Sequence, residues 1–312
     1  MSAPASPTTT SPSSSAPLPA SSGAETRGLV FGFLGIAVFS LSLPATRLAV
    51  AGLDPFLVGL GRSLAVSPLA GLLLLSGRSP WPGWKLLPSF LIVIAGVIAG
   101  FPVLSALAMQ SVPASHGAVL LGIMPLATAL AGTLRAGDRP SFGFWLAGIA
   151  GSAIVIGYAL VRGAGQPQPA DGFLLLAVIA AALGYAEGGR LAQRLGGWQV
   201  ICWALVIAAP LLVLPVAWLA WRHGLEAPPL AWAGFAYVAL FSQFIGFFFW
   251  YKGLALGGVA RVSQIQLVQL FLTLGASALF LGEHLDFSTI LFAVAVAIVL
   301  IIGRRMPVRR RQ

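Results

Sequence analysis

The amino-acid sequence predicts an all-α integral membrane protein of ten transmembrane helices, arranged as two inverted five-helix repeats. Three observations predict this fold class: an extreme apolar composition, ten long apolar runs, and short motifs that recur in both halves of the chain. Of the 312 residues, 58% are hydrophobic and 8% are charged, whereas soluble domains carry about 25% charged residues. A water-soluble fold could not bury so much apolar surface, so we expect the lipid bilayer to surround the chain.

Each predicted transmembrane helix is an apolar run of about the 20 residues that a helix needs to cross a bilayer. The runs lack the alternation of every second residue that is typical of membrane barrel strands. Short connections rich in Gly, Pro and Arg separate them, for example Gly77-Arg-Ser-Pro80 and Gly137-Asp-Arg-Pro140. The ten runs, in chain order, are residues 28–48, 54–76, 86–108, 113–134, 141–161, 172–190, 198–221, 230–251, 259–281 and 287–303.

The distribution of Lys and Arg predicts the orientation, because basic loops stay on the cytoplasmic side. With the N-terminus inside, 14 of the 18 basic residues are cytoplasmic, 3 are outside, and Arg62 lies within the second run. Residues 1–27, rich in Ser, Pro and Thr, are then predicted to be a disordered cytoplasmic tail, and residues 304–312 a basic cytoplasmic tail. The predicted location is the cytoplasmic (inner) membrane of a bacterium, with both termini cytoplasmic.

Two short motifs recur in the same order in both halves. Ala106-Leu-Ala-Met109 matches Gly253-Leu-Ala-Leu256, and Arg135-Ala-Gly-Asp138 matches Phe280-Leu-Gly-Glu283. Since five runs make up each half, the two halves enter the membrane in opposite directions, an arrangement that many transporters use. The predicted repeats are residues 28–161 and 172–303.

Longer motifs in a fixed order resemble a known family. They are Leu43-Pro-Ala-Thr-Arg-Leu-Ala-Val50, Gly52-Leu-Asp-Pro55, Val112-Pro-Ala-Ser-His-Gly-Ala-Val119, Gly122-Ile-Met-Pro-Leu126, Trp250-Tyr-Lys-Gly-Leu-Ala-Leu-Gly-Gly-Val-Ala-Arg-Val262, Gln264-Ile-Gln-Leu-Val-Gln269 and Leu281-Gly-Glu283. Over roughly residues 28–303 the chain resembles the EamA-type members of the drug/metabolite transporter superfamily. It departs at Leu270, where members often have proline, and at Asp138, where the first turn usually has glutamate.

The resemblance implies ten helices, a central cavity between the two halves, and transport without ATP hydrolysis. It also implies a substrate among amino acids, other metabolites and drugs, often moved outward.

Arg62 is the most informative single residue, because it lies eight positions inside the second run, about 12 Å below its outer end at 1.5 Å per residue. A charge near the bilayer centre costs roughly 2.5–3.5 kcal/mol on insertion scales and usually faces the bundle interior or a cavity. We expect Arg62 to bind an anionic group such as a substrate carboxylate, or to act in gating. The alternative is a guanidinium that reaches the outer headgroups or backbone carbonyls.

A stripe of neutral polar side chains marks the ninth run and predicts the lining of a cavity. At 100° per residue the stripe falls within an arc of about 120°, and interhelical hydrogen bonding is the alternative interpretation. Gln243, in the middle of the eighth run, is a further candidate substrate ligand. Trp250 and Tyr251, at the cytoplasmic end of that run, are also candidate cavity residues, with an interfacial aromatic belt as the favoured interpretation. The stripe consists of Ser263, Gln266, Gln269, Thr273 and Ser277, of which the first four are predicted substrate-binding residues.

Two ionisable residues are candidates for coupling transport to protons. His116 opens the fourth run near the outer face and is also a candidate substrate ligand, because histidine changes charge near neutral pH; an ordinary interfacial histidine is the alternative. Glu187 is the only acid inside a predicted span, towards the cytoplasmic end of the sixth run. Arg190, three positions later, offers it a simple surface ion pair instead. Glu283 and Asp138 are interpreted as structural residues at helix ends.

These features predict a secondary transporter that moves an amino acid or a similar amphipathic metabolite outward by alternating access. The energy is expected to come from a gradient, because the sequence has no Gly-rich phosphate loop followed by lysine. The alternatives are a drug or other metabolite permease of the same fold, a channel, and a membrane-embedded enzyme. An enzyme is disfavoured because no nucleophile with its base, acid pair or metal-ligand set is indicated.

The expected partners are a small-molecule substrate and the lipid bilayer, with a homodimer left open. No cofactor or metal is expected, since one cysteine, Cys202, and three widely separated histidines give no ligand spacing. Nucleic acid is not an expected partner, because the basic residues lie in short loops between apolar runs.

Overall fold

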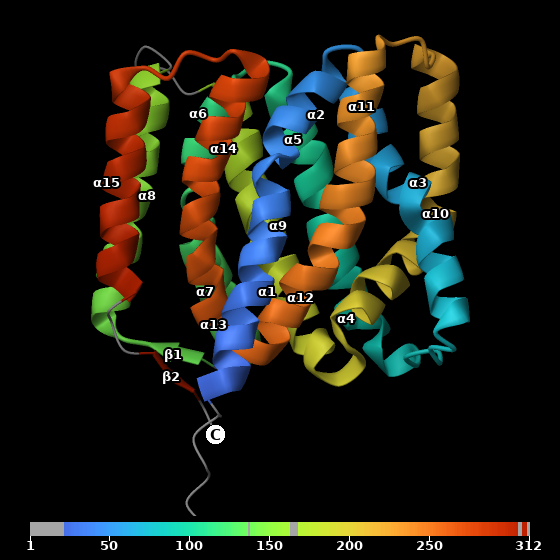
Figure 1. Cartoon of the computed structure of the whole chain (residues 1–312), viewed down its shortest axis with the longest axis horizontal. Coiled ribbons are helices and arrows are strands. Elements are labelled where there is room, and N and C mark those ends of the chain that lie inside the picture. The colour runs from blue at the N-terminus through green and yellow to red at the C-terminus, as the bar shows by residue number, and fades with distance from the viewer. Residues whose placement is uncertain (1–21, 137, 163–167, 305–307, 311–312) are drawn as a thin grey trace, which may run out of the picture.

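The computed structural model describes residues 22–136, 138–162, 168–304 and 308–310, which form a bundle of helices that run up and down between two ends (Figure 1). The first 21 residues of the predicted tail and Arg305 and Arg311 of the basic tail lie outside the described residues. We call the end of the bundle where α1 begins and β2 lies the terminal end, and the opposite end the distal end.

The five runs of the first half are all helical. Their elements are α1 (Ser22–Ser40) with α2 (Ser42–Val50); α3 (Pro55–Ser76); the 3₁₀ turn η1 (Trp84–Leu86) with α4 (Leu87–Val93), the π-helical η2 (Ile94–Gly100) and α5 (Phe101–Met109); α6 (Ala114–Leu121) with α7 (Met124–Ala136); and α8 (Phe142–Arg162).

The second half repeats this order. Its elements are α9 (Pro169–Leu195); α10 (Gly197–His223); α11 (Pro229–Tyr237) with the π-helical η3 (Val238–Ile245) and α12 (Gly246–Gly257); α13 (Val259–Val262) with the 3₁₀ turn η4 (Ser263–Ile265) and α14 (Gln266–Leu281); and α15 (Phe287–Arg304).

Length and hydropathy decide which of these helices can cross a bilayer. Within the described residues, eight continuous helical segments are long and apolar enough, and α8 and α15 hold shorter apolar stretches, Ile149–Tyr158 and Phe287–Val299. The prediction of a helical protein made of membrane-spanning segments is confirmed, while the number of ten spans stays a prediction.

Local sequence explains where the helices start and stop. The Asp54 carboxylate accepts hydrogen bonds from the backbone N–H groups of Phe56 (2.9 Å) and Leu57 (3.0 Å), and Pro55 occupies the first turn of α3. Both features are typical of a helix N-terminus. At helix C-termini, Gly258 follows α12 with a φ of 83° and Gly282 follows α14 with a φ of 64°. These positive backbone angles favour glycine.

Two details differ from the sequence prediction. Helix α1 begins at Ser22, so residues 22–27 extend the first helix although they were expected in the disordered tail; Ala, Glu and Arg in this stretch favour helix. In addition, β1 (Asp138–Pro140) pairs antiparallel with β2 (Val308–Arg310), so a short two-stranded sheet accompanies the helices. This sheet links the connection after α7 to the C-terminal segment.

Glycines allow α1 to approach α12 closely. A Cβ built at Gly253 would lie 2.6 Å from the backbone nitrogen of Gly32, and one at Gly28 would lie 2.5 Å from that of Gly257. The third run packs on α9 in the same manner, because a Cβ at Gly96 would lie 2.5 Å from the carbonyl oxygen of Ala180. Small residues thus let these helices pack backbone to backbone, as they do in other membrane bundles.

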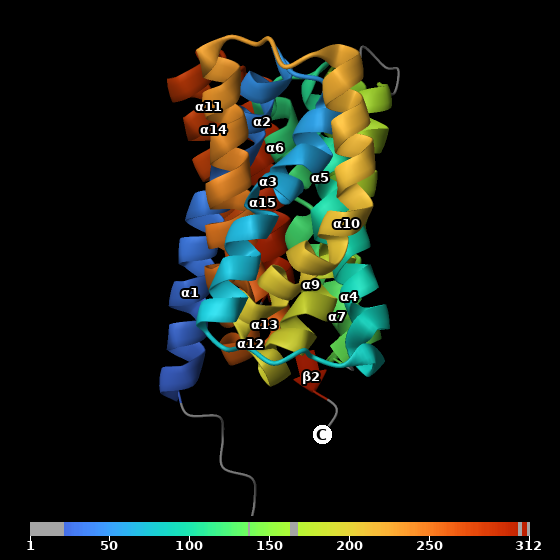
Figure 2. The same ribbon diagram turned by 90° about the vertical axis from the view of Figure 1, so that its right-hand side faces the viewer.

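The remaining large interfaces join helices that lie far apart in the sequence. Helix α3 packs along α10, and both face the viewer in Figure 2. Helix α8 packs along α15 at one edge of the bundle (Figure 1). Helix α7 packs on α9, while α14 packs on α1. The largest buried cluster includes Phe39, Tyr185 and Trp250 and lies between these layers.

Candidate functional site

A cavity lies between helices of both halves, deep in the bundle. The space not filled by atoms is about 360 Å³ in its first lobe. The gaps inside it hold little more than a water molecule, so an amino-acid-sized ligand requires the lining helices to separate. The lining residues are Phe39, Ser42, Leu43, Arg62, Val97, Phe101, Leu121, Tyr185, Ser242, Phe247 and Gln269.

Irregular helix segments form much of this wall. The first run is interrupted at Leu41, and α2 restarts at Ser42, whose hydroxyl lies 2.7 Å from that of Ser242 in the π-helical η3. The opposite π-helical segment, η2, contributes Val97. A π-helical turn changes the backbone hydrogen-bond pattern and is frequent at functional sites.

Arg62 of α3 is 2% exposed and lines the cavity. Its Nε has no hydrogen-bond partner among the described residues. An unpaired donor on a buried guanidinium is costly, and the planar fork of arginine matches a carboxylate in bidentate geometry. Arg62 is thus buried at the cavity wall, and its role as a ligand for an anionic group stays a prediction.

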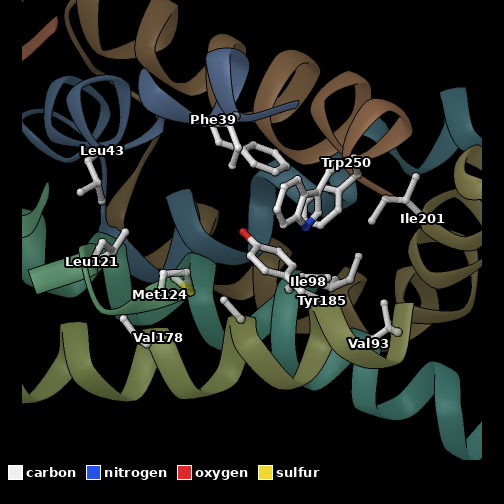
Figure 3. Close-up of a cluster of buried hydrophobic side chains, with 14 of the residues drawn as sticks. Phe39, Leu43, Val93, Ile98, Leu121, Met124, Val178, Tyr185, Ile201 and Trp250 are labelled. Atoms are coloured by element: carbon white, nitrogen blue, oxygen red, sulfur yellow. The ribbon is translucent and has the colours of Figure 1, made fainter. Parts of the chain in front are cut away.

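An aromatic cluster lies beside Arg62. The ring centroid of Tyr185, on α9, lies 5.4 Å from that of Trp250 and 6.4 Å from that of Phe39. Phe247 lies 5.1 Å from Phe39. Figure 3 shows Tyr185 between Phe39 and Trp250, with its hydroxyl directed towards the side of the cavity where Leu121 lies. These rings present apolar faces next to the buried guanidinium.

Sequence reasoning missed Tyr185 and misplaced two of its neighbours. Trp250 and Tyr251 are both fully buried, so the prediction that they form an interfacial belt is wrong. The Tyr251 hydroxyl donates to the carbonyl of Gly184 at 3.2 Å. The near-terminal position of the two residues in the run suggested the interface, but α12 packs so tightly on α1 and α9 that their rings lie inside the bundle.

The polar stripe of the ninth run divides between two roles. Gln269 lines the first lobe, and Gln266, Gln269 and Thr273 line an adjoining second lobe of about 270 Å³. The Thr273 hydroxyl also donates to the carbonyl of Ser40 on α1 at 2.8 Å. Ser263 and Ser277 instead donate to carbonyls of their own helical run, those of Ala260 and Thr273. Gln266 and Gln269 thus lie at the cavity, Thr273 both lines it and bonds to another helix, and Ser263 and Ser277 bond only within their own run.

Gln243 is fully buried, and its Nε2 donates to the Val97 carbonyl at 3.1 Å. This bond ties η3 of the second half to η2 of the first. Ser63 of α3 donates to the next carbonyl of η2, that of Ile98, at 3.1 Å. Gln243 is absent from the described cavity lining, so its position fits a tie between the two π-helical segments.

His116 lies at the distal end, where its Nε2 is 2.6 Å from Oδ1 of Asp171. Both side chains are buried, and the Tyr158 ring packs 5.1 Å from the imidazole. The contact joins α6 to the first turn of α9. Sequence reasoning placed Asp171 in a loop, because the apolar run begins just after it. The capping box that it forms with Gln168 is the signal that could have identified it.

Glu187, a second buried acid, lies near the terminal end and is fully buried. Its Oε1 accepts a short hydrogen bond from Arg190, and its Oε2 lies 3.8 Å from Nε of Arg135 on α7. Arg190 also donates to Ser89 of α4 at 2.9 Å. Glu187 thus links three runs, which is more than the simple surface pair considered as its alternative role.

Glu283 forms a cap that connects the two halves. Its carboxylate accepts hydrogen bonds from the backbone N–H groups of Ala114 (2.8 Å) and Ser115 (2.9 Å) at the start of α6. This geometry supports the interpretation of Glu283 as a structural residue at a helix end. Within the described residues, no three His, Cys, Asp or Glu side chains cluster in a way that could hold a metal ion.

Comparison with known proteins adds to this geometry. The description "EamA-like transporter family" matches residues 26–162 and again residues 168–303. The "Uncharacterized transporter YdeK" of Bacillus subtilis (strain 168) is 44% identical over 286 residues, which cover 90% of this chain and 98% of that protein. The "Probable terminal-alkyne amino-acid exporter" of Streptantibioticus cattleyicolor is 29% identical over 294 residues, 89% of this chain and 94% of that protein.

One solved crystal structure superposes with a TM-score of 0.65 over 89% of this chain and 98% of that chain, at 15% sequence identity. At that identity the likeness shows the fold alone. The family description covers nearly all of the chain, and the relative from Bacillus subtilis matches it almost end to end. This chain is thus a multi-pass membrane protein that belongs to the EamA-like transporter family, a family of transporters and not of enzymes.

Proposed function

We propose that the protein is a secondary transporter that exports an amino acid, or a similar amphipathic carboxylate, by alternating access. The observation that carries this proposal is Arg62, a buried guanidinium on the wall of a central cavity with Nε unpartnered among the described residues. A substrate carboxylate would supply the missing acceptors. The apolar remainder of the substrate would lie against Phe39, Tyr185 and Phe247.

We propose that the fold consists of ten spans in two inverted repeats, with both termini in the cytoplasm of a bacterial inner-membrane protein. The first run of each half packs on the third run of the other half. Helix α1 packs on α12, and in the corresponding interface α9 packs on η2 and α5. The third run of each half contains a π-helical segment, η2 or η3. The family description also matches each half separately. Such internal symmetry is what lets two related halves open in turn to either side.

The two ends of the bundle suggest how access alternates. On the orientation proposed here, the distal end is extracellular and is held by His116 with Asp171 and by Glu283 on α6. The terminal end is cytoplasmic and is held by Glu187 with two arginines. Opening to one side would break the contacts of that side while those of the other side persist.

We propose His116 as the group that couples transport to protons, with Glu187 as the second candidate. His116 faces a carboxylate, and its contact with Asp171 joins the two halves and must break when the distal end opens. Glu187 forms ion pairs with two arginines, Arg190 and Arg135. The geometry thus favours a structural role for Glu187 over proton transfer.

The substrate class rests on the chemistry of the cavity and on one relative. Arg62 fits a carboxylate, and hydroxyl and amide oxygens of Ser42, Ser242 and Gln269 are available to an ammonium group. The relative from Streptantibioticus cattleyicolor carries the name of an amino-acid exporter. Both considerations favour an amino acid over a drug or an uncharged metabolite, and the name of the relative favours outward movement.

The test is uptake of a labelled amino acid mixture into proteoliposomes that contain the purified protein, with and without an imposed proton gradient. We expect saturable uptake that Arg62→Gln reduces to the level of empty liposomes and that Arg62→Lys partly retains. Arg222→Gln is the matched control, since Arg222 is exposed and lies over the Trp218 ring. Uptake that does not saturate would indicate a channel, and uptake unaffected by Arg62→Gln would contradict the proposed site.

A further inference from the structure

The second lobe of the cavity differs in character from the first. It shares Leu43, Leu121 and Gln269 with the Arg62 lobe, so the two lobes adjoin. Its other walls are mostly apolar and include Met124 and Leu270. No charged side chain is among its described lining residues. A ligand that extends from the first lobe into the second therefore has one part beside the charged Arg62 and the other part in a narrow, mainly apolar space.

One polar side chain in this lobe has unused hydrogen-bonding groups. Gln266 is 4% exposed, and both its Nε2 and its Oε1 lack partners among the described residues. Its neighbour in the lobe, Thr273, donates to Ser40. Buried amides nearly always have partners, because an unpaired donor or acceptor inside a protein is costly. Gln266 therefore presents a free donor and a free acceptor to whatever occupies the lobe.

We infer that this lobe is the pocket for the substrate's side chain and that Gln266 binds a neutral hydrogen-bonding group at its end. The inference rests on the proposed function, because it assumes that Arg62 holds the carboxylate in the adjoining lobe. An amide has one donor face and one acceptor face, so the group that matches both atoms of Gln266 is another carboxamide. The substrate class is amino acids with a short methylene chain that ends in a carboxamide, in preference to apolar or charged side chains.

Isosteric amino acids make this preference measurable. Glutamine and 2-amino-5-methylhexanoic acid have side chains of the same shape, and so have asparagine and leucine, but only the first of each pair can hydrogen-bond. A neutral hydrogen bond contributes about 0.5–1.5 kcal/mol in proteins, which corresponds to about a three- to tenfold preference for the carboxamide. Competition against labelled glutamine uptake in proteoliposomes gives this ratio for each pair.

The decisive variant is Gln266→Met, which keeps the length of the side chain and removes the amide. We expect it to abolish or reverse the preference within each pair while uptake that depends on Arg62 persists. Gln264→Met is the matched control, because Gln264 lies two residues away and donates to the Ala260 carbonyl at 3.5 Å, outside the described cavity lining. The control should keep the wild-type ratio. Size-exclusion profiles of both variants establish that they fold.

Three results would overturn the inference, and they are distinguishable. An unchanged ratio in a well-folded Gln266→Met protein would leave Arg62 as the carboxylate site but exclude side-chain recognition by Gln266. An equal loss of uptake for both members of a pair would assign Gln266 to packing alone. Absence of Arg62-dependent uptake for every carboxylate would contradict the proposed function, and with it the orientation on which this pocket depends.

Discussion

At the scale of single residues, some of the buried polar atoms that lack partners among the described residues line the cavity. Nε of Arg62 and the amide of Gln266 do so, whereas Nε1 of Trp250 and Oε1 of Gln243 are unpartnered outside the described lining. Each orphaned group costs about 1–3 kcal/mol when it is sealed away from water. Other buried polar groups, such as Nε2 of Gln243 and the hydroxyl of Thr273, donate to backbone carbonyls. The unpaired groups of Arg62 and Gln266 therefore lie where a ligand could pair with them.

The cap formed by Glu283 leads to a prediction about stability. Glu283→Ala removes the acceptor for two backbone N–H groups at the start of α6, and we expect a loss of about 0.5–2 kcal/mol, as for other N-terminal caps. Thermal unfolding in detergent measures this as a lower midpoint. Glu226→Ala, at an exposed loop position, should leave the midpoint unchanged. Equal midpoints for both variants would show that the cap contributes nothing.

The contact between His116 and Asp171 leads to a prediction about energy coupling. We expect His116→Asn to lose the stimulation of uptake by an imposed proton gradient, because asparagine keeps a hydrogen-bonding group but cannot carry a proton. Exchange of substrate across the membrane without a gradient should continue. The measurement compares gradient-driven uptake with exchange in the same proteoliposomes. A variant that keeps its full gradient response would exclude His116 as the coupling group.

At the scale of secondary-structure elements, glycine contacts determine how closely α1 and α12 approach. We predict opposite effects for the same substitution at two helical sites. Gly253→Ala places a methyl group 2.6 Å from a backbone nitrogen of α1, and such overpacking typically costs about 1–3 kcal/mol. Gly275→Ala, whose Cβ meets nothing within 4 Å among the described residues, should be neutral or slightly stabilising, since alanine favours helix. Thermal unfolding of the two variants provides the comparison, and a midpoint for Gly253→Ala equal to that of the wild type would contradict the role of this contact.

The sequence predicted the positions of the helices well and the residues of the candidate site less completely. Hydropathy and connection residues located the eight segments of the described residues that are long and apolar enough to cross a bilayer; the count of ten spans stays a prediction. Breaks within the runs, such as the π-helical segments η2 and η3, were not predicted, because hydropathy does not report the backbone hydrogen-bond pattern. Arg62 stood out because a charge inside a span is rare. Tyr185 did not, since an aromatic residue in an apolar run looks the same whether it faces lipid, core or cavity.

At the scale of the whole molecule, alternating access predicts that a cross-link between the two halves at the distal end stops transport. Ser115 and Glu283 belong to different halves, and the Glu283 carboxylate reaches the Ser115 N–H. With the one cysteine of the chain replaced in a Cys202→Ala background, a short bifunctional thiol reagent should join Ser115→Cys to Glu283→Cys. We expect uptake to fall to background and to recover after reduction. The two single-cysteine variants control for the reagent itself, and undiminished uptake in the cross-linked protein would exclude opening at this end.

The pairing of α8 with α15 has a consequence for how the protein is made. Helix α8 packs chiefly along α15, the last helix described, at one edge of the bundle. During translation α8 therefore enters the membrane with its main partner still unsynthesised, and about 125 further residues must follow before that partner arrives. Until then the helix is surrounded by lipid or by insertion factors. A ribosome that stalls before residue 287 leaves a product with an unpaired helix, which quality-control proteases in the membrane can distinguish from the finished protein.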